Sequence, residues 1–462
     1  MNKKKLHIHL IGIGGSGMSG LASILLDLGY RISGSDITPS KITKRLTDKG
    51  ATIFKGHSRD NIKGVNLVVV SSAIPESNPE IEGAIKENIK IIKRAEMLAK
   101  IMEHKYGIAV AGTHGKTTTT SMISLLLEKS GFDPTVIIGG EVNDIQGNAK
   151  LGFGRCVVAE ADESDGSFLK LNPSLVVVTN IEDDHLDHYK NLENVLKDFK
   201  KFINKIPDNG SVILCKDCEN IRRLIKGYRK KYITYGISLD ADIMAKEIEL
   251  NKLNSKSQIY WRNKKMGELY LNVAGHHNIL NSLAAIAVAK ELGMNFIEIT
   301  KILEAYQGVQ RRMEVVINID DEILIMDDYA HHPTEIKVTL NAIKHSWKNR
   351  RIIVVFQPHR YTRTKLLAEK FGKVFFDADR VIINDVYAAN EPPILGISGR
   401  TIFNEIKKAN HSHLKYIPSK NNTIDYLYEN IQPGDIIITM GAGDVWTISQ
   451  KLAKKLKKTK VF

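Results

Sequence analysis

Cysteine is scarce in this chain, and long apolar runs are missing. Only 3 of its 462 residues are cysteines, too few for a disulfide scaffold in a chain of this size, so we expect a reducing, cytoplasmic setting. No run of about 18 apolar residues occurs, so we expect no transmembrane helix and no membrane partner. Cys215 and Cys218 have CxxC spacing without a second Cys or His pair nearby, which favours two ordinary residues beside a turn over a zinc or redox site.

Low-complexity linkers and fixed-period repeats are also absent. A hydrophobic content of 43% and a charged content of 26% are globular values, which exclude a disordered or fibrous chain. At this length we expect about two to four domains. The net charge of +14 suits anionic ligands, but much of the excess is diffuse lysine. A nucleic-acid-binding hypothesis therefore rests on charge alone, and we expect no nucleic-acid partner.

The clearest motif is a glycine turn between an expected strand and an expected helix. The apolar run 106–110 leads into AGTHGKTTT from Ala111, and a helical segment follows. In such a turn, backbone N–H groups and a helix N-terminus converge on phosphate oxygens, Lys116 supplies a point charge, and Thr117 supplies a hydroxyl for Mg2+. Val110 stands where the strict Walker pattern has its first glycine. A capped helix N-terminus is the alternative, but the strand–turn–helix order favours a phosphate site.

A second glycine motif opens the chain. A strand expected over residues 6–11 leads into G-x-G-x-x-G from Gly12 to Gly17, and the strand after the next helix ends at Asp36. This order is a dinucleotide-binding fingerprint. NAD binding is one interpretation, and a diphosphate at the helix N-terminus with a ribose nearby is the more cautious one. A later strand ends at Ser71 and Ser72, which belong either to this site or to an ordinary turn.

Acidic clusters follow two apolar strands beyond the phosphate loop. The strand 156–159 runs into Glu160, and the strand 175–178 leads to a cluster that contains His185. Carboxylates and a histidine at strand ends are suited to Mg2+ that bridges a triphosphate, and solvated acidic loops are the alternative. A zinc site at His185 and His188 is less favoured, because the surroundings are hard carboxylates.

The last third of the chain predicts another parallel sheet with polar groups at one edge. Its histidine pair and its arginines have ordinary structural and surface interpretations, yet Arg360 and Arg363, three residues apart after a strand, can clamp a carboxylate. Earlier, His277 and Asn278 begin a helix. They can read a base there, or Asn278 can cap the helix.

These motifs resemble those of the Mur ligase family. The matching stretches run in order through nearly the whole chain: GIGGSGMSG from Gly12, SSAIP from Ser71, AGTHGKTTT from Ala111, EADESD from Glu160, TNIEDDHLDHY from Thr179, HHNILN from His276, RRME from Arg311, DDYAHHPTEI from Asp327, FQPHRYTRT from Phe356 and GAGD from Gly441. The resemblance implies an α/β fold of three domains, each with a mainly parallel sheet: a Rossmann-like UDP-sugar-binding domain (1–104), a central P-loop-type ATP-binding domain (105–312) and a Rossmann-like, amino-acid-binding C-terminal domain (313–462).

The resemblance also implies a reaction in peptidoglycan precursor synthesis. ATP phosphorylates the lactyl carboxylate of UDP-N-acetylmuramate, the amine of L-alanine attacks the acyl phosphate, and a tetrahedral intermediate collapses to an amide, ADP and phosphate. Such phosphoryl transfer depends on positioning and charge neutralisation. A rival within the family attaches a whole tripeptide to the same sugar nucleotide, but Tyr329 and the GIGGSGMSG stretch look more like the alanine enzyme. A dehydrogenase would leave the phosphate loop and the acidic clusters unexplained. We expect a monomer or weak homodimer.

The family's roles fall on matching positions of this sequence. The residues implied to bind ATP are Gly112, Thr113, His114, Gly115, Lys116, Thr117, Thr118, His277, Asn278, Arg312 and Asp328. Those implied to act in catalysis are Lys116, Glu160 and His185, and those implied to hold Mg2+ are Thr117, Glu160 and His185. Those implied to bind the UDP-sugar are Gly14, Gly15, Ser16, Gly17, Asp36, Ser71, Ser72 and His114, and those implied to receive alanine are Tyr329, His332, Arg360 and Arg363.

One departure from the family affects the second metal. Several relatives carry a carbamylated lysine on the helix after the His185 motif, but the lysines at 197, 200 and 201 do not clearly fall in its place. We therefore assign no such lysine and leave the full shell of a second Mg2+ open.

Overall fold

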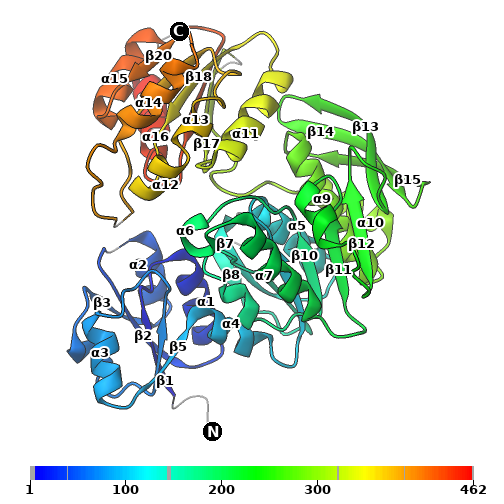
Figure 1. Cartoon of the computed structure of the whole chain (residues 1–462), viewed down its shortest axis with the longest axis vertical. Coiled ribbons are helices and arrows are strands. Elements are labelled where there is room, and N and C mark those ends of the chain that lie inside the picture. The colour runs from blue at the N-terminus through cyan, green and yellow to red at the C-terminus, as the bar shows by residue number, and fades with distance from the viewer. Residues whose placement is uncertain (1–5, 39, 143–146, 320–321, 390, 460–462) are drawn as a thin grey trace. The chain divides into compact units, whose positions relative to one another are not determined.

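A computed structural model of the chain describes residues 6–459 except 39, 143–146, 320–321 and 390. It contains three sheets (Figure 1). By its internal contacts the chain divides into two compact units: the first comprises residues up to 248 with 256–271 and 278–307, and the second comprises 249–255, 272–277 and the chain from 308 onward. The expected α/β class with mainly parallel sheets is confirmed, while the boundaries at 104/105 and 312/313 remain predictions.

The first sheet is entirely parallel among its five strands. Its order places the first strand in the centre, where the strand order reverses, and α/β sheets of this kind bind ligands at that point. The glycine motif lies there, between the central strand and the first helix. In sheet order the strands are β3 (Thr52–Lys55), β2 (Arg31–Asp36), β1 (His7–Ile11), β4 (Leu67–Val70) and β5 (Lys90–Lys93), and the helices are α1 (Ser16–Asp27), α2 (Lys41–Asp48), η2 (Arg59–Ile62), α3 (Pro79–Lys86) and α4 (Arg94–Met102).

The second sheet has ten strands and also belongs to the first unit for most of its length. The expected strands before the phosphate loop and the acidic clusters are β6 (Tyr106–Ala111), β9 (Cys156–Glu160) and β10 (Leu175–Val178), and they are parallel neighbours. The sequence did not predict the three strands after residue 242, β13 to β15, which extend one end of this sheet. The other strands are β7 (Thr135–Val142), β8 (Gly147–Lys150), β11 (Ser211–Cys215), β12 (Tyr232–Gly236), β13 (Ile243–Asn251), β14 (Asn254–Trp261) and β15 (Lys264–Leu271).

Helices follow the strands of the second sheet. The helix expected after the phosphate loop begins earlier than predicted, at Lys116, because the loop itself ends at Gly115. The C-terminal end of the loop is therefore already the helix N-terminus. These helices are α5 (Lys116–Lys129), α6 (Leu186–Tyr189), α7 (Leu192–Asn204), α8 (Glu219–Leu224), α9 (His276–Glu291) and α10 (Phe296–Glu304), with the short η4 (Ser167–Lys170).

The third sheet has six strands, with apolar clusters on both faces. Along β17, Leu324 and Met326 contribute to one cluster, whereas Ile323 and Ile325 contribute to the other. Successive strand residues point to opposite faces, so continuous apolar runs mark strands that are buried on both sides. In sheet order the strands are β16 (Glu314–Ile319), β17 (Ile323–Asp328), β21 (Asp435–Met440), β18 (Arg351–Phe356), β19 (Arg380–Ile383) and β20 (Leu414–Tyr416).

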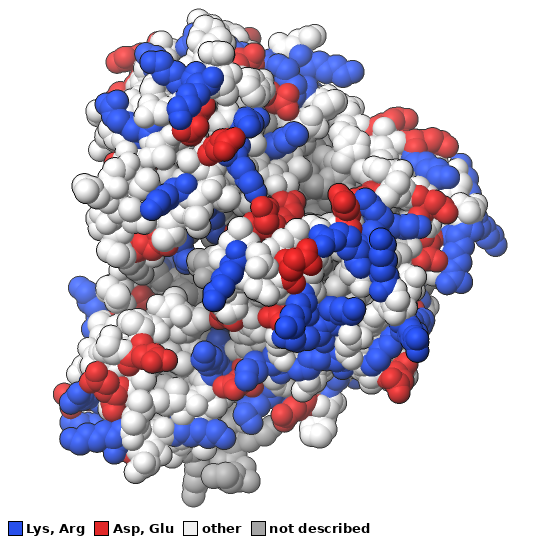
Figure 2. Space-filling view, in the orientation of Figure 1, with Lys and Arg blue, Asp and Glu red and all other residues white. Residues whose placement is uncertain are grey.

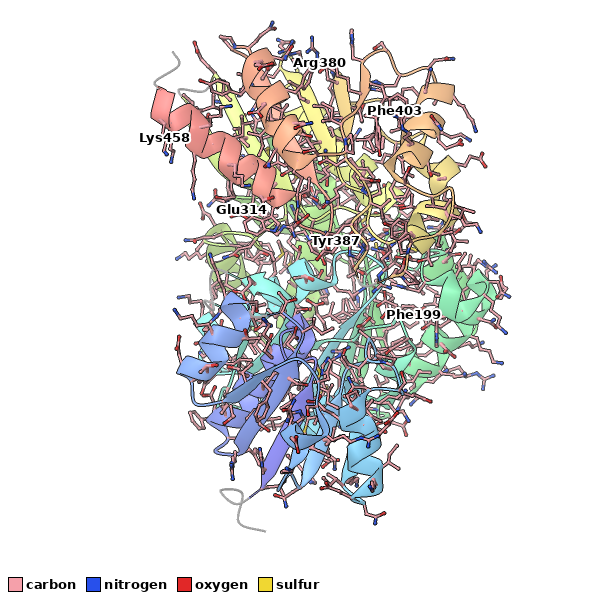
Figure 3. All side chains as sticks on the ribbon, turned by 90° about the vertical axis from the view of Figure 1, so that its left-hand side faces the viewer. Phe199, Glu314, Arg380, Tyr387, Phe403 and Lys458 are labelled. Atoms are coloured by element: carbon pink, nitrogen blue, oxygen red, sulfur yellow. The ribbon has the colours of Figure 1, made fainter. Side chains whose placement is uncertain are left out.

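The strands of the third sheet are parallel except for the pair β16–β17. Their carboxyl ends therefore meet at one edge, as expected. In Figure 3, Arg380 at the start of β19 and Tyr387 beyond its end lie at opposite edges of this sheet. The helices are α11 (Pro333–Ser346), α12 (Tyr361–Leu366), α13 (Ala368–Phe371), α14 (Gly399–Lys408), α15 (Lys420–Asn430) and α16 (Trp446–Thr459).

Charged side chains cover much of the visible surface. Figure 2 shows Lys and Arg interspersed with Asp and Glu over this face.

The three cysteines are free thiols, and burial raises the pKa of Cys215 to about 12. Among the described residues, no helix combines the length and apolar character that crossing a membrane requires.

Candidate active site

The phosphate loop is held in place by the end of the neighbouring strand β10. The backbone N–H of Thr113 donates to the Asn180 carbonyl at 3.1 Å, and the backbone N–H of His114 donates to Asn180 Oδ1 at 2.8 Å. The Thr179 hydroxyl and the Asn180 amide both donate to the His114 carbonyl, at 2.6 and 3.0 Å. These hydrogen bonds pair the polar backbone groups of Thr113 and His114 and fix the conformation of the turn. Sequence reasoning did not single out Thr179 or Asn180.

At two positions in this loop, the backbone conformation and the surrounding space admit only glycine. Gly112 has a φ of +133° and Gly115 has a φ of +79°, values that side chains disfavour. A Cβ atom on Gly112 would lie 2.1 Å from Thr179 Oγ1, and one on Gly115 would lie 2.6 Å from Asn281 Oδ1. The loop is therefore a tight concave turn that ends on the N-terminus of α5, which is the geometry of an anion cradle.

Lys116 lies in this cradle with its ammonium group already paired. Its Nζ donates to the carbonyls of Gly112 and Thr113, at 2.5 and 3.2 Å, and to Glu163 Oε1 at 2.8 Å. The side chains of Lys116 and Glu163 are only 17% and 3% exposed. Burial lowers the pKa of Lys116, but the carboxylates of Glu163 and Asp162 outweigh it and raise that pKa overall. A charged ammonium therefore lies inside the loop, and its role toward a nucleotide phosphate stays a prediction.

Glu163 is the partner that sequence reasoning missed. Burial raises its pKa to about 7, and the nearby Asp162 adds to this while Lys116 opposes it. The Tyr189 hydroxyl donates to the Glu163 carbonyl at 2.5 Å and anchors its backbone. The only available signal was its place in the acidic stretch after β9.

The predicted Mg2+ ligands Thr117 and Glu160 lie together. The Thr117 hydroxyl is close enough to the Glu160 carboxylate to lower its pKa. Glu160 Oε1 accepts the backbone N–H of Gly139 at 2.8 Å. Burial raises the pKa of Glu160, although the Gly139 N–H and Lys116 both lower it. An alcohol and a carboxylate beside a phosphate cradle are the hard oxygen donors that Mg2+ prefers, so the residues present fit this ion. Thr118, one residue further along α5, is buried.

His185, the third predicted ligand, has a left-handed backbone with a φ of +54° at the start of α6. Its Nε2 lies 4.0 Å from Glu163 Oε1 and 3.6 Å from Asp184 Oδ2. The structure thus places it beside the Lys116 partner. A left-handed backbone is uncommon outside glycine and is costly, and such strain is often found at functional sites.

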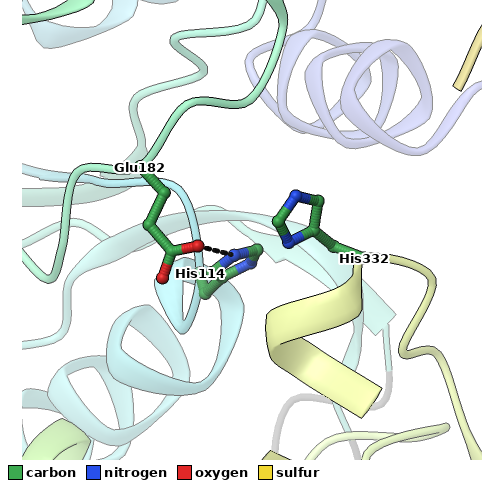
Figure 4. A group of neighbouring side chains, drawn as sticks. All are labelled: His114, Glu182 and His332. Carbon is green, nitrogen blue, oxygen red and sulfur yellow. Dashed lines mark ion pairs between the residues drawn. The ribbon is translucent and has the colours of Figure 1, made fainter. Parts of the chain in front are cut away.

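His114 projects from the phosphate loop and forms an ion pair with Glu182. Figure 4 shows the His114 Nε2 to Glu182 Oε2 contact, which measures 3.5 Å. The backbone N–H of Glu182 also donates to the Thr113 hydroxyl at 2.9 Å. The third side chain drawn there, His332, belongs to the second unit.

The predicted adenine contacts lie at the start of α9. Asn278 is buried, and Asn281 donates to it at 3.4 Å. Asn281 in turn accepts the Thr119 hydroxyl at 3.1 Å, which ties the start of α9 to α5. Burial lowers the pKa of His277 to about 4, and Arg312 lowers it further, so this ring is neutral at pH 7.

The predicted UDP-sugar loop follows β1. The backbone N–H of Gly14 donates to Asp36 Oδ2 at 2.9 Å, so Asp36 braces the loop. Gly15 is the N-cap of α1 and the Ser16 carbonyl accepts from Asn148 at 2.6 Å. Gly17 packs close to Arg94. In the turn that follows β4, the Ser71 hydroxyl accepts the backbone N–H of Ala73, and Ser72 belongs to the same turn.

In the second unit, the polar groups at the edge of the third sheet surround Tyr329. Asp328 accepts the backbone N–H groups of Ala330 and Met313, at 2.7 and 2.8 Å, and burial raises its pKa to about 6. Arg312 lies over the Tyr329 ring at 5.3 Å and donates to Glu335 at 3.3 Å. The structure therefore brings Arg312, Asp328 and Tyr329 together, while the roles assigned to them stay predictions.

Arg363 contacts the ring of His359, which belongs to a small group of packed rings. Its Nη1 lies 3.2 Å from His359 Nδ1, and the His359 ring stacks on Tyr387 at a centroid distance of 5.7 Å. Burial lowers the pKa of His359 to about 3, with further lowering by His331 and Arg363, so the ring is neutral and can accept this bond. Arg360 has a strained backbone with a φ of +69° and an exposed side chain.

The two adjacent histidines have different surroundings. His332 is buried at the N-cap of α11, where its Nδ1 accepts the Thr334 N–H at 3.4 Å. His331 instead packs against the rings of Tyr329 and His359, at 5.4 and 5.8 Å. The role assigned to His332 stays a prediction, and His331 and His359 join the candidate set. Sequence alone could not separate two neighbouring histidines, since the difference is that His332 is the N-cap of α11 and His331 lies outside the helix.

Comparison with known proteins identifies the family of the chain. Sequence models described as the Mur ligase family catalytic domain, the Mur ligase middle domain and the Mur ligase glutamate ligase domain match residues 7–106, 110–289 and 311–443. UDP-N-acetylmuramate--L-alanine ligases from Geotalea uraniireducens and Pelotomaculum thermopropionicum are 49% and 48% identical to the chain, over 97% and 98% of its length and 98% of theirs.

Solved structures point to the same family. The UDP-N-acetylmuramate-alanine ligase of Thermotoga maritima superimposes with a TM-score of 0.83 at 30% identity, covering 98% of this chain and all of that one. A murein peptide ligase from Psychrobacter arcticus gives a TM-score of 0.72 at 26% identity over 98% of both chains. With all three domain models matched in order along nearly its full length, this chain belongs to the Mur ligase family.

Proposed function

We propose that this chain joins L-alanine to UDP-N-acetylmuramate with the consumption of ATP, giving UDP-N-acetylmuramoyl-L-alanine, ADP and phosphate in peptidoglycan precursor synthesis. The observation that carries the proposal is the pre-formed cradle between β6 and α5, with the Lys116 ammonium at its centre. The near-half identity to alanine ligases over the full chain supports the choice of substrates.

Each part of the chain has its own task in this reaction. The amides of the loop from Gly112 and the Lys116 ammonium bind the ATP phosphates and stabilise the charge of the transferred phosphoryl group. Thr117 and Glu160 would hold Mg2+, which neutralises the phosphates, and Glu160 with His185 would contribute to a second metal position. The glycine loop after β1 binds the UDP diphosphate rather than NAD, because the reaction transfers no hydride.

The second unit receives the amino acid. The guanidinium groups of Arg360 and Arg363 bind its carboxylate, which leaves the amine free to attack the acyl phosphate. Tyr329 limits the space for the side chain. Arg312 and Asp328 bind ATP from the second unit. We further propose that the enzyme works in the cytoplasm as a monomer or weak homodimer, with no nucleic-acid or membrane partner.

A turnover assay tests the proposal and its nearest rival. Purified protein receives MgATP and UDP-N-acetylmuramate together with either L-alanine or the tripeptide that a murein peptide ligase would use. We expect phosphate release and a UDP-linked amide only with L-alanine. Preference for the tripeptide would reassign the chain within its family, and no phosphate release with either amine would sink the proposal.

The metal assignment is tested by Glu160→Gln. The amide keeps the shape of the side chain but loses the charge, so we expect the Mg2+ concentration for half-maximal rate to rise by roughly tenfold. Binding of Mn2+ in the presence of ADP, followed by electron paramagnetic resonance, should weaken by a similar factor. Glu298→Gln, at an exposed position on α10, serves as the matched control. Unchanged Mn2+ binding in Glu160→Gln would show that this carboxylate is not a ligand.

A further inference from the structure

A fully buried carboxylate lies beneath the glycine loop of the first sheet. Glu80, on α3, has 0% of its side chain exposed. Its Oε2 accepts the Ser35 hydroxyl at 2.5 Å and the His57 Nδ1 at 3.0 Å, and its Oε1 accepts the Asn61 amide at 2.6 Å. His9 Nε2 lies 3.5 Å from Oε1. The four partners come from β1, β2, the segment after β3 and η2, so one carboxylate joins four separate segments.

This carboxylate is charged. Burial raises the pKa of Glu80, but the nearby His9 imidazole and the hydrogen bonds from Ser35 and Asn61 outweigh burial and lower the pKa to about 2. A buried ion adds little stability compared with well-packed apolar residues of the same volume. The packing of α3 on the sheet therefore does not account for a charge at this position, whereas an orienting role does.

One partner of Glu80 also holds the glycine loop. The Ser35 carbonyl accepts the backbone N–H groups of Gly12 and Ile13, at 2.9 and 3.1 Å. The next residue, Asp36, accepts the N–H of Gly14 at 2.9 Å. The end of β2 is thus bonded to the loop through its backbone and to Glu80 through the Ser35 hydroxyl. Any shift of Ser35 would move the loop amides by a similar amount.

We propose that Glu80 is a positioning residue for the sugar-nucleotide site: through Ser35 it sets the geometry of the loop that binds the UDP diphosphate. The inference rests on the proposed function, because that function makes this loop the diphosphate site. Glu80 itself is fully buried and contacts no substrate. Its effect should therefore be confined to the UDP-sugar and should not extend to ATP or L-alanine.

Glu80→Gln is the direct test. Both carboxylate oxygens accept hydrogen bonds, so an amide nitrogen at either position would face a donor and displace it. We expect the Kd and KM for UDP-N-acetylmuramate to rise by roughly tenfold, because a buried donor loses its acceptor. The KM values for ATP and L-alanine and the kcat should change by less than about twofold. Isothermal titration with UDP-N-acetylmuramate alone measures the Kd independently of turnover.

Glu82→Gln is the matched control, since Glu82 lies on the same helix with 47% of its side chain exposed and pairs with Arg59 on the surface. It should bind UDP-N-acetylmuramate like the wild type. Ser35→Ala removes only the linking hydroxyl and should weaken UDP-sugar binding in the same direction. If Glu80 acts through Ser35, the double variant should be no weaker than Glu80→Gln alone.

Three outcomes would overturn the inference. They are wild-type affinity for UDP-N-acetylmuramate in folded Glu80→Gln, an equal loss of ATP affinity, or additive losses in the double variant. Should Glu80→Gln fail to fold, Ser35→Ala decides alone, and unchanged UDP-sugar binding would then count against the proposal. Absence of UDP-sugar binding in the wild type would instead contradict the proposed function, so the two failures are distinguishable.

Discussion

Replacing Lys116 with alanine is expected to lower the rate of phosphate release by roughly a hundredfold to a thousandfold or more. The ammonium group lies inside the cradle, bonded to the Gly112 and Thr113 carbonyls and to Glu163. Phosphoryl transfer relies on such fixed charge rather than on covalent help. Alanine leaves the cradle without its positive charge, and Glu163 without its partner, so acyl phosphate should not form.

The loss should be specific to the ATP half of the reaction. Isothermal titration with UDP-N-acetylmuramate should give a nearly wild-type Kd for Lys116→Ala, because the glycine loop after β1 is unchanged. Lys129→Ala is the control, since Lys129 is exposed at the far end of the same helix. Its turnover should match the wild type. Substantial phosphate release by Lys116→Ala would show that the cradle is not the phosphate site.

Replacing Arg363 with alanine is expected to raise the KM for L-alanine by roughly ten- to a hundredfold, with a smaller effect on kcat. The guanidinium is oriented by its 3.2 Å contact with His359 Nδ1. The neutral His359 ring is held in turn by stacking on Tyr387. An arginine fixed in this way loses little conformational entropy when it binds a carboxylate. Steady-state kinetics with L-alanine varied at saturating MgATP and UDP-N-acetylmuramate measure the change.

Lys365→Ala, at an exposed position on the same helix α12, separates the specific effect from a general loss of positive charge. It should leave the KM for L-alanine within about twofold of the wild type. A rise in the KM for ATP equal to that for L-alanine would mean that Arg363 belongs to the nucleotide site and that its assignment is wrong.

Much of the fold could be predicted because the buried strands are strongly apolar. The strand β10 has the predicted bounds, and β9 ends one residue beyond its predicted end. Parallel strands that are buried on both faces are continuous apolar runs bounded by polar turns. The strands β13 to β15 were missed, of which β15 forms the edge of the second sheet. β15 begins with two lysines, and Gly267 and Glu268 interrupt its apolar residues. An edge strand is partly solvated, and without a clear period its pattern does not stand out from a loop.

Glycines, lysine, hydroxyls and carboxylates in their order along the chain determined that a phosphate cradle would form, since backbone geometry and local spacing are properties of consecutive residues. Tertiary structure alone decided which side chains complete it. Glu163 reaches Lys116, His359 orients Arg363, and Glu80 reaches Ser35 only after distant segments pack together. Hydrogen bonds and ion pairs act over a few ångströms, and spacing along the sequence does not encode such distances between remote residues.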